Sequence, residues 1–139
     1  MPERRGFVHH IDLTVRDANA SAAFYDAVLG FMGFKRSHED PRGIDWDLTE
    51  ARGGFCSVGI KSAEGDSAAR AHNRYAPGLH HLAWSAESRD DVDRLYAVLL
   101  EIGATVLDAP AAYPQYGPTY YAVFFADPDG LKLEFVHAP

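Results

Sequence analysis

Hydrophobic and polar residues alternate along residues 7–15, which predicts a strand at the start of the chain. Successive side chains of a strand point to opposite faces. One face is apolar and the other is polar. The apolar face carries Ile11, Leu13 and Val15, and the polar face carries His10, Asp12 and Thr14.

A helix is predicted to follow at residues 19–29, where apolar residues recur at helical spacing. Its stripe consists of Ala20, Ala23, Phe24, Ala27 and Val28. We expect Gly30 to cap its end, because glycine adopts the cap conformation without a Cβ penalty. Three more strands are predicted near residues 34–37, 44–49 and 55–61, separated by turn-rich segments at residues 40–43 and 52–54.

The second half of the chain repeats this order. Residues 79–86 predict a strand with Leu82 and Trp84 on one face and His81 on the other. Ser88 and Asp91 have the spacing of a helix N-terminal cap, and Gly103 marks the end of that helix. The remaining segments are strands near residues 105–107, 120–125 and 131–137, with a loop rich in Pro and Tyr at residues 108–119.

The repeat is marked by a histidine doublet that occurs twice, as His9-His10 and as His80-His81, at an offset of 71 residues. The same offset relates Tyr25 to Tyr96. A fixed offset that links a strand motif and a helix motif indicates two copies of one unit. We therefore predict an α+β fold of two βαβββ modules. Their curved mixed sheets would face each other around a central cavity, with the helices outside.

The predicted boundaries place module one at residues 6–62, a polar connection at 63–78 and module two at 79–138, within a single domain of 139 residues. The formal net charge is −7 and no cluster of Lys or Arg occurs, which argues against nucleic-acid binding. No apolar stretch has transmembrane length and no signal core precedes the first strand, so we expect a cytoplasmic protein without membrane contact. The single cysteine, Cys56, cannot form an internal disulfide.

The period of two selects three polar residues that point away from the helices: His10, His81 and Glu134. Each alone is more often a hydrogen-bonded or solvated residue than a ligand. Together, two imidazoles and a carboxylate form a known ligand set that leaves positions open for substrate. They predict one divalent metal ion, and Fe, Mn, Ni and Zn suit these ligands equally. His9 and His80 are interpreted as outer partners of the ligands or as packing residues.

The ordered motifs resemble those of the vicinal oxygen chelate superfamily, which includes glyoxalase I, fosfomycin-resistance thiol transferases, extradiol dioxygenases and bleomycin-binding proteins. The resemblance extends over almost the whole chain. The matching motifs are the His strand ending in Val15-Arg16-Asp17, Phe24-Tyr25 with Leu29-Gly30, Gly33-Phe34, the second His strand, and Asp127-Pro128-Asp129-Gly130 followed by Glu134. The resemblance places His10, His81 and Glu134 on the metal-ligand positions of the family.

Departures from the named members limit what the resemblance implies. Aligning Arg52-Gly53-Gly54 with Pro128-Asp129-Gly130 puts Val58 opposite Glu134, where glyoxalase I has a further Glu, so hemithioacetal isomerisation is not expected. The tyrosine position of extradiol dioxygenases falls on Phe124, and residues 115–117 contain no His, which weakens ring cleavage. Bleomycin-type binders generally lack the metal triad, so its presence argues against sequestration alone.

We therefore expect a metal-dependent enzyme that acts on a small oxygenated or thiol-conjugated molecule. Its chemistry would be that of a glyoxalase-like lyase or isomerase, or a related reaction. Asp12 and Tyr121 are the catalytic candidates, and Asp12 is equally well explained as a residue that orients a ligand. Tyr113, Tyr116 and Tyr120 are the candidates for an aromatic wall against the substrate. The alternatives are an extradiol-type dioxygenase and a ligand-binding protein without turnover. Relatives of this size often form homodimers, and we expect one here.

Overall fold

The structure is a computed structural model that describes residues 3, 5–49 and 54–139. The chain divides into two compact units, the first extending to Ala69 and the second spanning Arg70–Pro139. The first unit contains β1 (His10–Val15), α1 (Ala18–Phe31), β2 (Lys35–Asp40), β3 (Gly43–Thr49), β4 (Phe55–Ser62) and the short 3-10 helix η1 (Gly65–Ala69). The second contains β5 (Leu82–Ser85), α2 (Arg89–Glu101), β6 (Thr105–Ala112), β7 (Tyr121–Ala126) and β8 (Lys132–His137).

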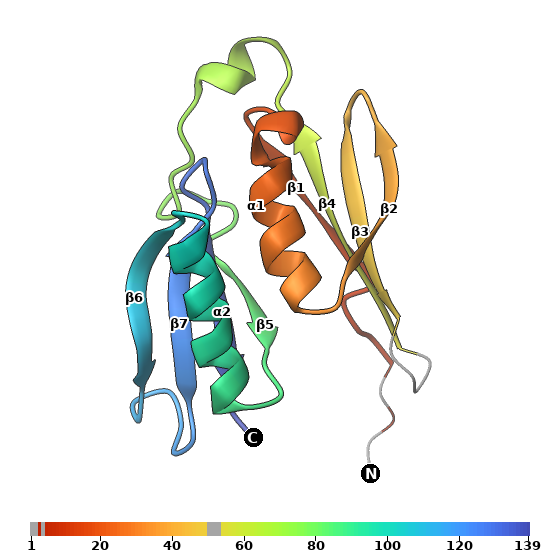
Figure 1. Cartoon of the computed structure of the whole chain (residues 1–139). Helices are drawn as coiled ribbons and strands as arrows, with labels where there is room; N and C mark the ends of the chain where they lie inside the picture. The colour runs from red at the N-terminus through yellow and green to blue at the C-terminus, as the bar shows by residue number, and fades with distance from the viewer. Residues whose placement is uncertain (1–2, 4, 50–53) are drawn as a thin grey trace. The chain divides into compact units, whose positions relative to one another are not determined.

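Each unit forms one four-stranded mixed sheet, with strand order β1-β4-β3-β2 in the first and β5-β8-β7-β6 in the second (Figure 1). In both sheets the opening strand pairs in parallel with the last strand, and the other pairs are antiparallel. The predicted α+β class and the repeated strand–helix–three-strand order are confirmed. The enclosure of a cavity by the two sheets stays a prediction.

One face of each sheet packs against its helix, α1 on β2, β3 and β4, and α2 on β6, β7 and β8. Leu13 and Val15 are buried on the helix face of β1, whereas His10 and Asp12 are exposed on the other, as the alternation predicts. Among the described residues, no helix combines the length and hydrophobicity needed to cross a membrane.

The buried stripe of α1 is rotated relative to the predicted one. Tyr25 and Leu29 are fully buried beside Phe24 and Val28, whereas Ala20 and Ala23 are exposed. Large side chains bury more apolar area than alanine, so they determine which side of the helix faces the sheet. Gly30 lies inside the helix, and the predicted cap there is wrong.

The chain leaves α1 through Gly33 instead, whose φ of +99° lies in the left-handed region that favours glycine. At the end of α2 the predicted glycine, Gly103, does adopt such a conformation, with φ +70°. The Ser88 hydroxyl accepts a hydrogen bond from the backbone N–H of Asp91, which confirms the predicted N-cap of α2.

The edge strands β2 and β6 extend beyond their predicted ends. All six residues of β2 are exposed, and β6 continues through Pro110 into the segment predicted to be loop. Both strands have irregular register with their single neighbour. A strand at the edge of a sheet can leave its side chains exposed and tolerates Pro. The hydrophobic pattern of the sequence therefore underestimates the length of such a strand. The predicted turn at residues 52–54 lies outside the described residues except for Gly54.

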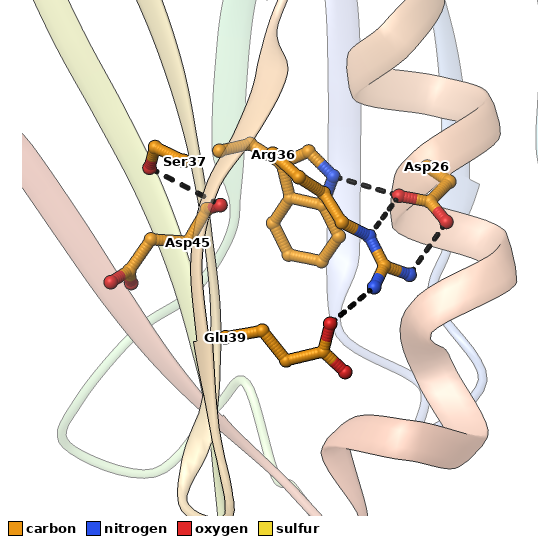
Figure 2. Close-up of polar contacts among 6 residues, drawn as sticks. Asp26, Arg36, Ser37, Glu39 and Asp45 are labelled. Carbon is orange, nitrogen blue, oxygen red and sulfur yellow. Dashed lines mark hydrogen bonds and ion pairs between the residues drawn. The ribbon is translucent and has the colours of Figure 1, made fainter.

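Asp26 links α1 to the β2–β3 hairpin (Figure 2). Its two carboxylate oxygens accept from Nε and Nη2 of Arg36 at 2.8 and 2.7 Å, and Oδ1 also accepts from the indole N–H of Trp46 at 2.9 Å. Trp46 is 1% exposed, so its N–H needs this acceptor. Arg36 lowers the pKa of Asp26 despite partial burial, with a further contribution from Trp46.

We expect Asp26→Asn to lower the free energy of unfolding by about 1 kcal/mol, the usual scale for a hydrogen-bonded pair that is partly exposed. Because the pKa of Asp26 is lowered by folding, its stabilisation is present above the ordinary aspartate value. It is lost as the pH falls through the lower folded-state value. Urea unfolding at neutral and acidic pH should show a difference from the wild type that shrinks in acid. Glu101→Gln, at the exposed end of α2, is the control.

Candidate metal centre

Glu134 lies at the middle of β8 and is 2% exposed. The register pairs it with Ala83 of β5 and Phe124 of β7, on the face of the sheet that does not contact α2. Its Oε1 lies 3.2 Å from Nε2 of His81. Its Oε2 accepts a hydrogen bond from the Tyr120 hydroxyl. A buried carboxylate is tolerated only when such partners compensate for the lost water.

His81 directly precedes β5, and its side chain is 35% exposed. The Nδ1 atom of His81 lies 2.8 Å from Nδ1 of His80, while Nε2 is turned toward Glu134. Partial desolvation of the exposed ring, followed by the charges of His81, Lys132 and Arg74, lowers the pKa of His80. Both ring nitrogens of His81 thus have a neighbour, Nδ1 of His80 at one and Oε1 of Glu134 at the other, and these two contacts fix the orientation of the ring.

The distance between His81 and Glu134 fits two ligands of one ion. Ligand atoms about 2.1 Å from an ion, at tetrahedral or octahedral angles, lie about 3.0–3.4 Å apart. The observed separation of 3.2 Å falls within this range. Imidazole nitrogen and carboxylate oxygen are also donors that Fe, Mn, Ni and Zn accept, so these two residues fit the predicted metal.

The turn before β8 sets the position of Glu134. The buried Asp127 accepts hydrogen bonds at Oδ1 from the backbone N–H groups of Asp129 and Leu131, each at 2.9 Å. Gly130 has φ +84°, which a residue with a side chain rarely adopts. The Asp-Pro-Asp-Gly motif thus closes a rigid turn and starts β8 in the register that places Glu134 toward His81.

The three predicted substrate tyrosines form one aromatic cluster next to Glu134. Tyr113 stacks on Tyr116 with ring centroids 5.7 Å apart, and Tyr116 contacts Tyr120 at 5.4 Å. Burial, followed by the hydrogen bond to Glu134, raises the pKa of Tyr120 well above its ordinary value, so this phenol remains a donor. Tyr116 is 62% exposed, which leaves part of the cluster open to solvent.

Tyr121 lies on the opposite face of the sheet from Glu134. Its hydroxyl donates to Asp93 of α2 at 2.6 Å, and the guanidinium of Arg89 lies 4.8 Å from its ring centroid. The alternation along β7 separates Tyr121 from the face that carries Phe124 and Glu134. The structure does not bring this predicted catalytic residue together with Glu134.

His10 and Asp12 belong to the first unit and share the polar face of β1. Nδ1 of His10 lies 3.0 Å from Nδ1 of His9, whose ring packs against Phe55 at 4.8 Å. The arrangement at the start of β1 thus matches that of His80 and His81 before β5. Within either unit, the described residues include no group of three His, Cys, Asp or Glu side chains placed to hold an ion.

The residue of the first unit that corresponds to Glu134 is Gly59, not Val58. The offset of 71 residues relates Asp12 to Ala83, and Asp12 pairs with Gly59 whereas Ala83 pairs with Glu134. Val58 is fully buried on the helix face. The alignment that puts Val58 opposite Glu134 is therefore wrong by one position, and Arg52 and Gly53, on which it relies, lie outside the described residues.

Asp12 and Asp45 lie on either side of Gly59, on neighbouring strands. A Cβ atom added to Gly59 would be 2.3 Å from Oδ1 of Asp12 and 2.4 Å from Oδ1 of Asp45. The ammonium group of Lys61 lies 3.0 Å from Asp45, and this contact raises the pKa of Lys61. The lack of a side chain at Gly59 is what gives the two carboxylates this space.

Asp45 and Lys61 were missed in the sequence analysis. The signal was present, because Ile44, Trp46 and Leu48 alternate with polar residues along β3 and place Asp45 on the face of His10. Figure 2 shows Asp45 on the opposite side of β3 from Asp26.

The fold and the site define a protein of paired βαβββ modules with a polar, histidine-containing face on each sheet. Residues 7–135 match the model of the Glyoxalase/Bleomycin resistance protein/Dioxygenase superfamily. The chain belongs to this superfamily.

The chain is similar to YqjT, an uncharacterized protein of Bacillus subtilis, with 35% identity over 93% of this chain and 97% of YqjT. Among solved structures, it resembles a candidate glyoxalase from Bacillus halodurans with TM-score 0.81 and 31% identity, covering 96% of this chain and 97% of the other. A lactoylglutathione lyase from Agrobacterium tumefaciens shares the fold alone, with TM-score 0.68 and 17% identity, covering 98% of this chain and 96% of the lyase.

Tyr120→Phe should lower the free energy of unfolding by about 1–3 kcal/mol, because it leaves a buried carboxylate oxygen of Glu134 without its donor. Tyr116→Phe removes a hydroxyl from the same cluster at an exposed ring and should change stability by less than about 0.5 kcal/mol. Urea unfolding of both variants measures the difference. Equal stabilities would show that the hydrogen bond to Glu134 contributes nothing.

Proposed function

We propose that this protein is a divalent-metal-dependent enzyme that acts on a small oxygenated or thiol-conjugated organic molecule, with His10, His81 and Glu134 as metal ligands. The observation that carries the proposal is the 3.2 Å separation of His81 Nε2 and Glu134 Oε1, together with the burial of Glu134. His10 is added on the repeat, because it occupies in β1 the position that His81 occupies before β5.

A divalent ion held by these side chains would act as a Lewis acid that stabilises negative charge developing on a substrate oxygen. Glu134 would bind the ion as a carboxylate, and it has one oxygen directed at His81 and the other held by Tyr120. The hydrogen bond from the Tyr120 hydroxyl fixes this orientation and takes the place of water at Oε2 of Glu134. Tyr113, Tyr116 and Tyr120 supply an aromatic wall against which a flat organic substrate packs.

Asp12 is our candidate for moving the substrate proton. Its carboxylate lies over Gly59, the position at which module two carries Glu134. A carboxylate from a neighbouring strand therefore reaches the space that a side chain at Gly59 would occupy. The geometry supports Asp12 over Tyr121, whose hydroxyl is bound to Asp93 on the other face of its sheet.

Ligand binding without turnover is the second candidate function. It applies if the Asp12 carboxylate only orients a neighbouring group, because Gly59 itself carries no carboxylate and proton transfer on both sides of a substrate needs two positioned groups. We also propose a homodimer, on the resemblance to relatives of this size, and a small-molecule ligand rather than nucleic acid, on the net charge of −7.

The purified protein should bind one divalent ion per chain, and His10→Ala, His81→Ala and Glu134→Gln should each abolish stoichiometric binding. Removing one of three ligands leaves too few donors for a stable site. Elemental analysis and calorimetric titration with Zn, Ni, Mn and Fe(II) measure the stoichiometry. The control is His72→Ala, at an exposed histidine outside the site.

Circular dichroism should show that all four variants keep the fold, since the three ligands lie outside the apolar packing beneath the helices. Full-affinity binding by any of the three ligand variants would contradict the assignment of that residue.

Hemithioacetal isomerisation should be about 10²–10⁴-fold slower than in a dedicated enzyme, the usual cost of a missing positioned base. The assay is formation of lactoylglutathione with nickel or zinc supplied, for the wild type and for Asp12→Asn. Residual activity that disappears in Asp12→Asn would assign the proton transfer to Asp12. If the wild type and Asp12→Asn both reached the rate of a dedicated enzyme, the expectation that the missing carboxylate side chain at Gly59 slows the reaction would be wrong.

A further inference from the structure

The two histidine doublets make the same contact in both units. Nδ1 of His9 lies 3.0 Å from Nδ1 of His10, and Nδ1 of His80 lies 2.8 Å from Nδ1 of His81. The two pairs are separated by the repeat offset of 71 residues. His10 begins β1 directly after His9, and His80 and His81 directly precede β5. A ring-to-ring hydrogen bond between two adjacent residues requires a specific turn of both side chains.

Other side chains hold the outer histidine of each pair in place. The ring of His80 packs edge-on against Tyr75 at 5.8 Å, and the guanidinium of Arg74 lies 5.0 Å from the Tyr75 ring centroid. The ring of His9 packs against Phe55 at 4.8 Å. The outer histidine is thus supported by Phe55 in the first unit and by Tyr75 in the second, although the contact between the two histidines is the same in both units.

A hydrogen bond between two Nδ1 atoms contains a single proton. A neutral imidazole carries one N–H, and two protonated Nδ1 atoms at 2.8 Å would repel each other. The tautomer of one ring therefore determines that of the other. If the His80 Nδ1–H donates, His81 carries its proton on Nε2, where it faces Glu134.

The opposite arrangement frees Nε2 of His81 as a ligand. The shared proton then belongs to Nδ1 of His81, Nε2 of His81 has released its proton to solvent, and the exposed ring of His80 has taken one from solvent at Nε2. The number of protons on the pair is unchanged. The doublet can therefore present a metal-binding nitrogen without creating a charge or an unpaired Nδ1–H group.

We propose that His80 and His9 are positioning residues, each accepting the Nδ1–H of the next histidine and thereby fixing the ring orientation and tautomer in which Nε2 binds the ion. This inference rests on the proposed metal site. An outer partner that holds the second nitrogen of a ligating histidine typically changes metal affinity by 10–100-fold.

The test compares His80→Phe, which keeps a flat ring without an acceptor, with His80→Asn, whose side-chain oxygen can stand where Nδ1 stood. Titration with Zn²⁺ should give affinity about 10–100-fold weaker for His80→Phe. His80→Asn should recover most of the loss, and the control His72→Phe should match the wild type. His9→Phe should weaken binding in the same direction.

Two-bond ¹H–¹⁵N spectra of the metal-free proteins supply a readout that does not depend on metal. The Nδ1 resonance of His81 should shift in His80→Phe and not in His72→Phe, because only the first variant removes its hydrogen-bond partner. Wild-type affinity together with an unchanged His81 ring in His80→Phe would overturn the inference. If the wild type binds no metal, the proposed function fails, and the ring spectra still decide whether His80 sets the tautomer.

Discussion

In each unit the apolar side chains of the strands pack beneath a single helix, and the alternation of a strand forces the intervening residues onto the opposite face. Leu133 and Phe135 are buried on the helix side of β8, so Glu134 between them must point the other way. Leu13 and Val15 place His10 and Asp12 in the same manner. A slip of one residue in either register would bury the polar set under the helix.

The burial of the Glu134 carboxylate is the energetically unfavourable feature of this alternation. A carboxylate that is 2% exposed loses its hydration, and the structure compensates with His81 at one oxygen and Tyr120 at the other. Asp127 provides the third support, because the turn it closes determines where β8 begins. The same partners that make burial tolerable also orient the carboxylate toward His81, so stability and the proposed chemistry depend on one set of contacts.

The two modules keep the same backbone plan, and they carry different residues at the row of the sheet that contains Glu134. In module two this row is Ala83, Glu134 and Phe124, and in module one it is Asp12, Gly59 and Asp45. In module two the carboxylate is at the middle position of the row, on β8. In module one the two carboxylates are at the outer positions, on β1 and β3. The histidine doublets, by contrast, are the same in both, with the same Nδ1 contact. The repeat therefore conserves the ring pair and varies the acid.

The sequence by itself determined the module order, the α+β class and the face on which His10, His81 and Glu134 lie, because these follow from local periodicity and from the repeat. It placed the cap of α1 at Gly30 instead of Gly33 and ended β2 and β6 too early, since edge strands and helix ends have weak hydrophobic signals. Tertiary structure alone decided that Gly59 corresponds to Glu134, that Tyr120 and not Tyr121 contacts Glu134, and that each histidine doublet is hydrogen-bonded. The first two facts depend on pairing between segments that are distant in the chain, and no local pattern encodes the register of such pairs. The third depends on how two adjacent rings turn toward each other, which the sequence pattern does not specify.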